Sequence, residues 1–326
     1  MKLHHDKEIF RDAIISTANF LNLRDIFVEK DYWITVALHT IFTSEVGNHS
    51  VFKGGTALSK CYGLIERFSE DIDLVILRNP GESDNQLKNR IRSISKTVEK
   101  VMPEIEVKGM TNKKGNIRKT LHQYEKTFDG DFSQVREHIV VEASSLGNFE
   151  PFETKTIQSY IYDMIQAKGG DDIIQKYNLA PFPIQVLSKL RTFCEKIMSL
   201  VRFSSSENPI LDLRNKIRHV YDIHQMMHDK EIMAFLNSSE FDAMIIQVGK
   251  DDFKSYKSNN EWLHEHPSRA LLFHKTQQTW EQLSPEYHGN FKDLVTGTLP
   301  DENSILQKLD FLSSRLKKVR WKIIED

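Results

Sequence analysis

Residues 52–75 decide the fold, and they read FKGGTALSKCYGLIERFSEDIDLV. The β-favouring residues 51–53 predict a short strand, and the glycine pair 54–55 then opens a brief helical stretch. Residues 72–77 are mostly large and aliphatic, which predicts a buried strand. The stretch therefore predicts a strand, a glycine turn, a helix and a second strand, in that order.

Two carboxylates lie on the second of these strands. Residues two apart on a strand point to the same face, so Asp71 and Asp73 aim side by side while the aliphatic residues around them enter the core. Neighbouring carboxylates repel, and a hard divalent cation bound by their oxygens removes that repulsion. Taken alone, such a pair is usually a solvated sheet edge. Beside the glycine turn it predicts a Mg²⁺ site that serves a nucleoside triphosphate.

The glycine turn is expected to contact the phosphates. Gly54 and Gly55 have no Cβ, so their backbone N–H groups can approach phosphate oxygens, and the following helix adds its positive N-terminal dipole. The hydroxyl of Thr56 is a further donor to the same phosphates. We expect these three residues to bind the nucleotide, together with Arg67 and Ser69 from the same stretch.

Composition limits the class of protein. A chain of 326 residues can form one large or two ordinary domains, and a net charge of −2 excludes a basic field over the whole molecule. The two cysteines, Cys61 and Cys194, are far apart and predict neither a disulfide framework nor a zinc site. The first ten residues lack the apolar run of a signal peptide, and no uncharged run reaches membrane-spanning length. We expect a cytoplasmic protein with no membrane partner.

Periodicity predicts the remaining elements. Helical spacing dominates the first 45 residues, and further strands are expected at residues 105–107, 117–128 and 139–143, which complete one mixed sheet. After residue 151 helical periods take over, and the strand signal shrinks to residues 184–187. Later helices are expected at residues 189–203, 210–228, 229–248, 268–283 and 303–321. We predict a domain over residues 1–180 that contains the sheet and the N-terminal helices, and a mostly helical domain over 181–326.

Residues 52–74 resemble the signature of the AbiEii/AbiGii nucleotidyltransferase toxin family, which includes the MenT toxins. The resemblance extends over most of residues 25–230. It implies an α+β, polymerase-β-like nucleotidyltransferase fold whose helical second domain completes the active-site cleft. It also implies the toxic half of a toxin–antitoxin or phage-defence pair, with a nucleoside triphosphate as substrate and a cognate antitoxin as partner. One departure is that Thr56 stands where the family has Ser, which keeps the hydroxyl but not any chemistry that requires Ser itself.

A third carboxylate is expected on the strand at residues 139–143. Transfer of a nucleotidyl group requires an activated oxygen and a stabilised pyrophosphate, and a metal clamp with a third acid serves both. Glu142 follows the β-branched run 139–141 of this strand and is our candidate for the third metal ligand, as the resemblance also implies. The alternative is a solvent-exposed acid at a strand end.

Two helical motifs complete the expected site. The resemblance implies that Lys196 lies near the triphosphate, where its ammonium would offset charge on the leaving phosphates. Lys189 and Arg191 lie on the same predicted helix and are expected to bind the nucleotide. Near residues 214–223 the resemblance implies a functional acid, Asp222, in contact with Lys196 or with the nucleoside. Without the resemblance, both segments read as solvated amphipathic helices.

The acceptor is the least determined part of the prediction. Two basic clusters suit RNA and equally suit ordinary solvated surface. They consist of Lys108, Lys113, Lys114, Arg118 and Lys119, and of Arg315, Lys317, Lys318, Arg320 and Lys322 around Trp321. We expect tRNA as the acceptor. Folds of this kind also modify proteins and small molecules, and a nucleotide- or RNA-binding module without turnover is a third alternative.

Overall fold

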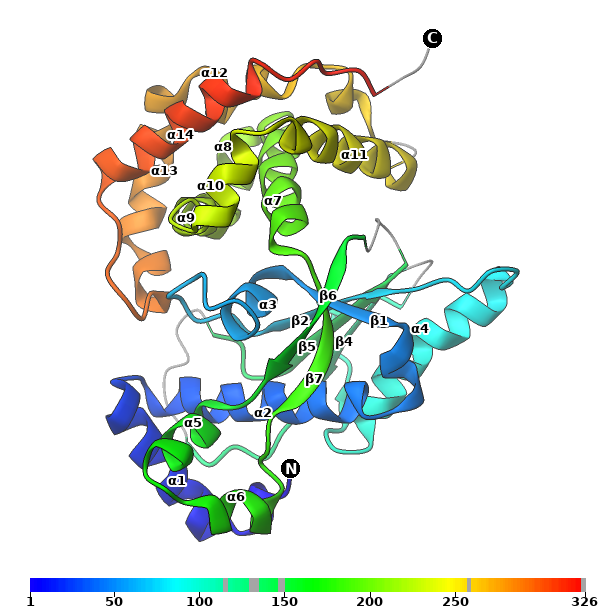
Figure 1. Ribbon diagram of the computed structural model, residues 1–326, viewed down its shortest axis with the longest axis vertical. Coiled ribbons are helices and arrows are strands. Elements are labelled where there is room, and N and C mark those ends of the chain that lie inside the picture. Colours follow the sequence, from blue (N-terminus) through cyan, green and yellow to red (C-terminus); the bar gives the residue numbers. More distant parts are fainter. Residues whose placement is uncertain (114–116, 129–134, 146–149, 257–258, 324–326) are drawn as a thin grey trace. The chain divides into compact units, whose positions relative to one another are not determined.

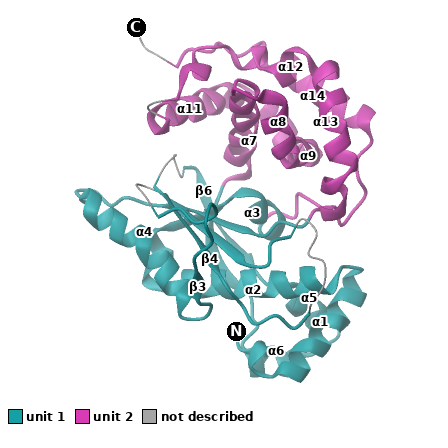
Figure 2. Ribbon diagram, turned by 180° about the vertical axis from the view of Figure 1, so that it is seen from behind, with its two compact units in different colours: residues 1–61, 68–187 teal, residues 62–67, 188–326 magenta. Residues whose placement is uncertain are grey.

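The computed structural model describes residues 1–113, 117–128, 135–145, 150–256 and 259–323. The chain forms two compact units (Figure 2). The first unit comprises residues 1–61 and 68–187, and the second comprises residues 62–67 and 188–326. The short segment 62–67 therefore belongs to the second unit, although residues on both sides of it belong to the first.

The first unit is built on a seven-stranded sheet with the order β3-β4-β5-β2-β1-β7-β6 (Figure 1). Strands β2 and β5 run parallel, as do β1 and β7, and the other neighbours are antiparallel. The bounds are β1 Ser50–Lys53, β2 Asp71–Ile76, β3 Glu104–Ile105, β4 Ile117–His122, β5 Ile139–Ser144, β6 Phe152–Ile157 and β7 Phe182–Leu187. This mixed sheet with flanking helices confirms the predicted α+β fold.

Helices cover the sheet of the first unit. The helices α2 and α4 pack against each other and against sheet strands, and α1 packs on α2 and α5 (Figure 1). The bounds are α1 Lys7–Leu21, α2 Asp25–Phe42, α3 Gly54–Lys60, α4 Asp84–Glu99, α5 Tyr160–Ala167 and α6 Asp171–Tyr177. A capping box between Ser83 and Gln86 begins α4. The predicted helical N-terminal lead-in is therefore present.

The second unit is helical, with α7 packed against α8, α9, α11 and α12. The side chain of Ser188 caps the start of α7 by accepting from the backbone N–H of Leu190. The bounds are α7 Lys189–Ser204, α8 Pro209–Asn215, α9 Ile217–Met226, α10 Lys230–Leu236, α11 Ser239–Ser255, α12 Leu271–His274, α13 Thr276–His288 and α14 Glu302–Leu316. Within the described residues, no helix is long and apolar enough to cross a membrane.

Two expectations about the elements were wrong. The strand β6 was missed because its sequence, FETKTI, is polar and mostly exposed at the sheet edge, so it has no apolar pattern. The helices expected at 210–228, 229–248 and 268–283 are each interrupted in the structure, at Lys216, at 237–238 and at Lys275. The side chain of Ser238 caps the start of α11, so the preceding helix α10 does not continue into it.

Candidate functional site

The glycine turn of the first unit lies directly against a carboxylate. Gly54 begins α3 with φ +85°, and a Cβ at this position would stand 2.4 Å from Oδ2 of Asp73. Both the backbone conformation and the space therefore require glycine. Two residues further, the hydroxyl of buried Thr56 donates to the hydroxyl of Ser69 at 3.0 Å. This bond joins α3 to the segment that leads into β2.

Three carboxylates gather on neighbouring strands. Asp71 and Asp73 alternate along β2 with the buried residues Ile72 and Leu74, as their spacing predicts. On the adjacent parallel strand β5, Glu142 is the register partner of Asp73. Burial, and after it the charges of Asp71 and Glu142, raise the pKa of Asp73 to about 7. The three carboxylates therefore interact electrostatically.

Cations partner these carboxylates. The guanidinium of Arg136 forms an ion pair with Asp71, and Nζ of Lys119 lies 3.8 Å from Oε2 of Glu142. Lys53 is the register partner of Asp73 on β1 and lowers its pKa. Asp71 and Glu142 thus each have a direct cationic neighbour. Asp73 retains an unfavourable environment for its charge.

The donor set fits Mg²⁺. Carboxylate oxygens are the ligands this ion prefers, and a bound ion would offset the burial and the repulsion from Asp71 and Glu142 that raise the pKa of Asp73. Across the described part of the chain, no group of three or more His, Cys, Asp or Glu side chains is arranged to hold a metal ion. Binding through all three carboxylates would therefore require Asp71 and Glu142 to turn from Arg136 and Lys119.

A buried ion pair lies next to the carboxylate cluster and holds the backbone around Arg136. Lys30 and Glu70 are almost completely buried and lie 2.7 Å apart, Nζ to Oε2. Glu70 also accepts the backbone N–H of Arg136 at 3.1 and 3.0 Å, and Nζ of Lys30 donates to the carbonyl oxygens of Arg136 and His138. Glu70 and Arg136 were not among the predicted site residues. The only sequence signal was the place of Glu70 directly before Asp71.

The second unit contains a separate buried triad. Nε and Nη2 of Arg67 donate to Oδ1 and Oδ2 of Asp222 at 2.7 and 2.8 Å, and Nζ of Lys196 donates to Oδ2 at 2.6 Å. Burial opposes the charge on Asp222, but both cations outweigh it and hold its pKa well below the usual range. The expected contact between Asp222 and Lys196 is present. Arg67, expected at the nucleotide, is buried and engaged by Asp222.

The other two cations expected on α7 are also engaged by acids. Lys189 lies 2.8 Å from Asp229 and 2.9 Å from Glu231. Arg191 is buried, with Nε 3.2 Å from Glu195 and Nη2 2.7 Å from Asp251. The structure thus brings Lys196, Asp222 and Arg67 together, and it places Lys189 and Arg191 in ion pairs of their own.

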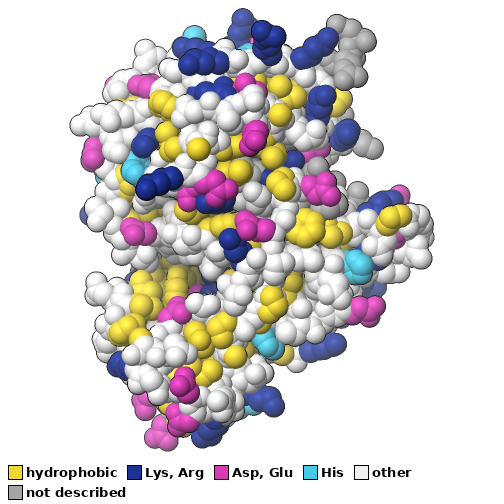
Figure 3. All heavy atoms as spheres, viewed as in Figure 1, with side chains coloured by type: hydrophobic (Ala, Val, Ile, Leu, Met, Phe, Trp, Pro, Cys, Tyr) yellow, Lys and Arg dark blue, Asp and Glu magenta, His cyan; other side chains and the backbone are white. Residues whose placement is uncertain are grey.

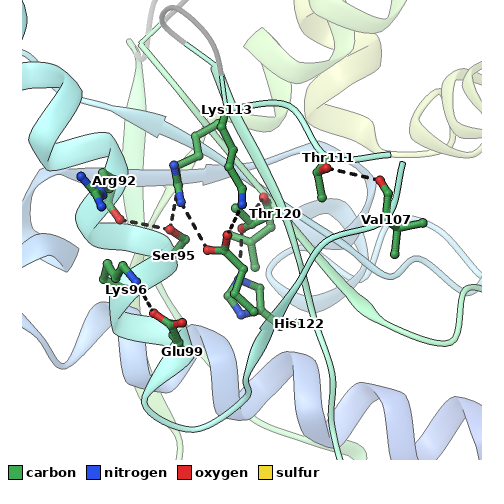
Figure 4. Close-up of polar contacts among 12 residues, drawn as sticks. Arg92, Ser95, Lys96, Glu99, Val107, Thr111, Lys113, Thr120 and His122 are labelled. Atoms are coloured by element: carbon green, nitrogen blue, oxygen red, sulfur yellow. Dashed lines mark hydrogen bonds and ion pairs between the residues drawn. The ribbon is translucent and has the colours of Figure 1, made fainter. Parts of the chain in front are cut away.

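The two basic clusters differ in character. In the first, Lys113 and Arg118 both pair with Glu104, at 2.8 and 3.3 Å, which offsets part of their charge. Lys113 is labelled among the polar contacts of this region in Figure 4. Lys114 of that cluster lies outside the described residues. In the second, Lys317, Lys318, Arg320 and Lys322 are exposed, whereas Arg315 is buried. Figure 3 shows lysine and arginine side chains gathered on the visible face near the C-terminal end of the chain.

Comparison with known proteins assigns the chain to a family. The family model described as nucleotidyl transferase AbiEii toxin, type IV TA system, matches residues 37–315. Among solved structures, the chain is similar to MenT4, a nucleotidyltransferase toxin from Mycobacterium tuberculosis H37Rv, with a TM-score of 0.46, 14% identity, and coverage of 94% of this chain and 99% of that one. No protein with a curated description matches in sequence. Because the family model spans most of its length, this chain belongs to the AbiEii family of nucleotidyltransferase toxins of type IV toxin–antitoxin systems.

Proposed function

We propose that this toxin transfers a nucleotidyl group from a nucleoside triphosphate to tRNA in a Mg²⁺-dependent reaction. Membership of the family implies a nucleoside triphosphate substrate and a cognate antitoxin. The observation that carries the metal dependence is the environment of Asp73. Its carboxylate lies against Gly54 and is opposed by the charges of Asp71 and Glu142, which is the arrangement that a divalent cation stabilises.

In this proposal Asp71, Asp73 and Glu142 hold the Mg²⁺. Bound there, the ion supplies neutralisation of phosphate charge and orientation of the triphosphate. Gly54 and Gly55 offer backbone N–H groups to the phosphates beside the metal, because the absent Cβ of Gly54 lets the carboxylate of Asp73 lie directly against the turn. Thr56 and Ser69, already joined by a hydrogen bond, offer hydroxyl groups to the same ligand.

Lys196 and Asp222 are proposed to act as a pair. The ammonium of Lys196 opposes charge that gathers on the departing pyrophosphate, and Asp222 fixes its position through the 2.6 Å hydrogen bond. The ion pairs of Arg67, Lys189 and Arg191 favour a positioning role for these three residues over a sole role in contacting phosphates.

The acceptor assignment rests on surface charge. Exposed Lys317, Lys318, Arg320 and Lys322 give the second unit a basic surface suited to an RNA backbone. Acceptor tRNA and nucleoside triphosphates are both cytoplasmic, so the proposal places the protein there. Modification of tRNA by a toxin would arrest growth, which also suits a role in phage defence.

The test is a transfer assay with each of the four α-labelled nucleoside triphosphates, Mg²⁺ and total tRNA. The expected result is label on tRNA that disappears with chelator and in Asp73→Asn. Label on protein, or on a small molecule after addition of cell extract, would replace tRNA with the alternative acceptor. Nucleotide binding without label on any acceptor would instead indicate a module without turnover and would overturn the proposal.

A further inference from the structure

Arg136 is fixed to the carboxylate cluster through its backbone. Its N–H donates to both carboxylate oxygens of Glu70, and its carbonyl accepts from Nζ of Lys30. The Lys30–Glu70 pair is almost completely buried, so this attachment is protected from water. Because Glu70 directly precedes Asp71, the same ion pair positions the start of β2 and the backbone of Arg136.

The side chain of Arg136 is held differently. Its Nη1 pairs with Asp71 and lies 3.6 Å from Oε1 of Glu70. The side chains of Arg136 and Asp71 are 34% and 33% exposed, so both remain accessible to a ligand. Among the described residues, only Nη1 of the Arg136 guanidinium contacts an acid, although a guanidinium has five N–H donors.

We propose that Arg136 is a triphosphate-binding residue that Asp71 holds in place until the metal-bound nucleotide arrives. This inference rests on the proposed Mg²⁺–nucleotide site. A divalent cation at Asp71 competes with the guanidinium for the same carboxylate oxygens. The displaced guanidinium then meets the phosphates, to which its planar fork binds in a bidentate manner. The guanidinium of Arg136 therefore exchanges the carboxylate of Asp71 for phosphate, while the backbone of Arg136 stays fixed by Lys30 and Glu70.

This exchange predicts two effects of opposite sign. Replacing Arg136 by Gln removes the cation that competes for Asp71, so Mn²⁺ alone should bind about three- to tenfold more tightly. The same variant loses a charge-assisted contact to the triphosphate. The dissociation constant for a non-hydrolysable triphosphate analogue in saturating Mn²⁺ should therefore rise about ten- to a hundredfold. Isothermal titration measures both constants, and neither depends on turnover.

Two further variants complete the experiment. Arg136→Lys keeps the charge without the fork, so its affinity for the analogue should fall between that of the wild type and Arg136→Gln. It also replaces Arg136→Gln if that protein does not fold. Arg118→Gln is the matched control, since Arg118 pairs with Glu104 and Ser95 and not with the three carboxylates. Its two affinities should equal those of the wild type.

The outcomes separate the two proposals. If the wild type binds neither Mn²⁺ nor the metal-bound analogue, the proposed function fails. If the wild type binds both and Arg136→Gln binds them equally well, only the role of Arg136 is overturned. A loss of both affinities in Arg136→Gln would also overturn it, because the proposal requires Mn²⁺ to bind more tightly once the competing guanidinium is removed.

Discussion

Asp222 accepts two hydrogen bonds from Arg67, at 2.7 and 2.8 Å, although 155 positions separate the two residues in sequence. Lys196 donates to the same carboxylate, so one buried acid pairs with two cations. Replacing Asp222 by Ala should therefore remove the buried carboxylate that both cations share and cost about 3–5 kcal/mol of unfolding free energy. Urea denaturation measures this cost. A Tm and midpoint equal to those of the wild type would show that the triad does not stabilise the second unit.

Lys196→Ala should behave differently from Asp222→Ala. Arg67 still donates two hydrogen bonds to Asp222 in this variant, so the carboxylate keeps a partner and the fold should be retained. We expect Mg²⁺-dependent nucleotide binding to persist while transfer falls by roughly two to three powers of ten, the scale of losing one well-placed electrostatic partner. Titration and a labelled-transfer assay on one preparation check both. Transfer at the wild-type rate would reduce Lys196 to a structural residue.

Asp73→Asn should abolish transfer without loss of stability. The pKa of Asp73 is raised to about 7 by burial, by Asp71 and by Glu142, so above that pH its ionised form opposes folding in the absence of metal. A neutral amide removes the repulsion, and the Tm of the metal-free protein should stay constant or rise. Metal-dependent nucleotide binding should be lost in this variant. A marked fall in Tm with normal transfer would indicate a structural role.

Gly54→Ala tests the contact between the glycine turn and Asp73. The new Cβ would lie 2.4 Å from Oδ2 of Asp73, and φ is +85°. Gly81→Ala is the control, because its φ is +74° with no atom within 4 Å of the added Cβ. Both variants should lose about 1–2 kcal/mol of stability from the left-handed backbone. Only Gly54→Ala should lose metal affinity and transfer. Equal activity in the two variants would contradict the placement of this turn in the site.

Stability should fall in mild acid. Burial lowers the pKa of His4 and His224 to about 4, and their rings bond Tyr32 and Ser304 at 2.8 and 2.7 Å. The unfolded chain binds more protons between pH 6.5 and 4, so stability is full above 6.5 and is lost as pH falls. Each half-buried ring should contribute less than about 1 kcal/mol per pH unit.

Thermal unfolding across this range should show a shallower pH dependence in the double variant His4→Gln, His224→Gln. The exposed His274→Gln provides the matched control and should follow the wild-type curve. Identical pH curves for the double variant and the wild type would refute the assignment.

Local patterns predicted most of the fold. The alternation of Asp71 and Asp73 with aliphatic residues predicted β2, and helical spacing predicted α1 and α2. The strand β6 escaped prediction because it pairs only along one edge of the sheet, so its side chains need no apolar pattern. The helix breaks at 216 and 237–238 were not predicted, because the apolar period of the sequence continues across them although the helical backbone is interrupted there.

The sequence by itself determined the chemistry of the carboxylate pair, because period-two geometry places Asp71 and Asp73 on one face wherever a strand forms. Only the tertiary structure decided their partners. Strand pairing makes Glu142 the neighbour of Asp73. The buried ion pair between Lys30 and Glu70 holds the backbone of Arg136 where its side chain reaches Asp71. Such partnerships depend on which distant segments share a buried low-dielectric environment, where an unpaired charge is costly, and no local pattern records that choice.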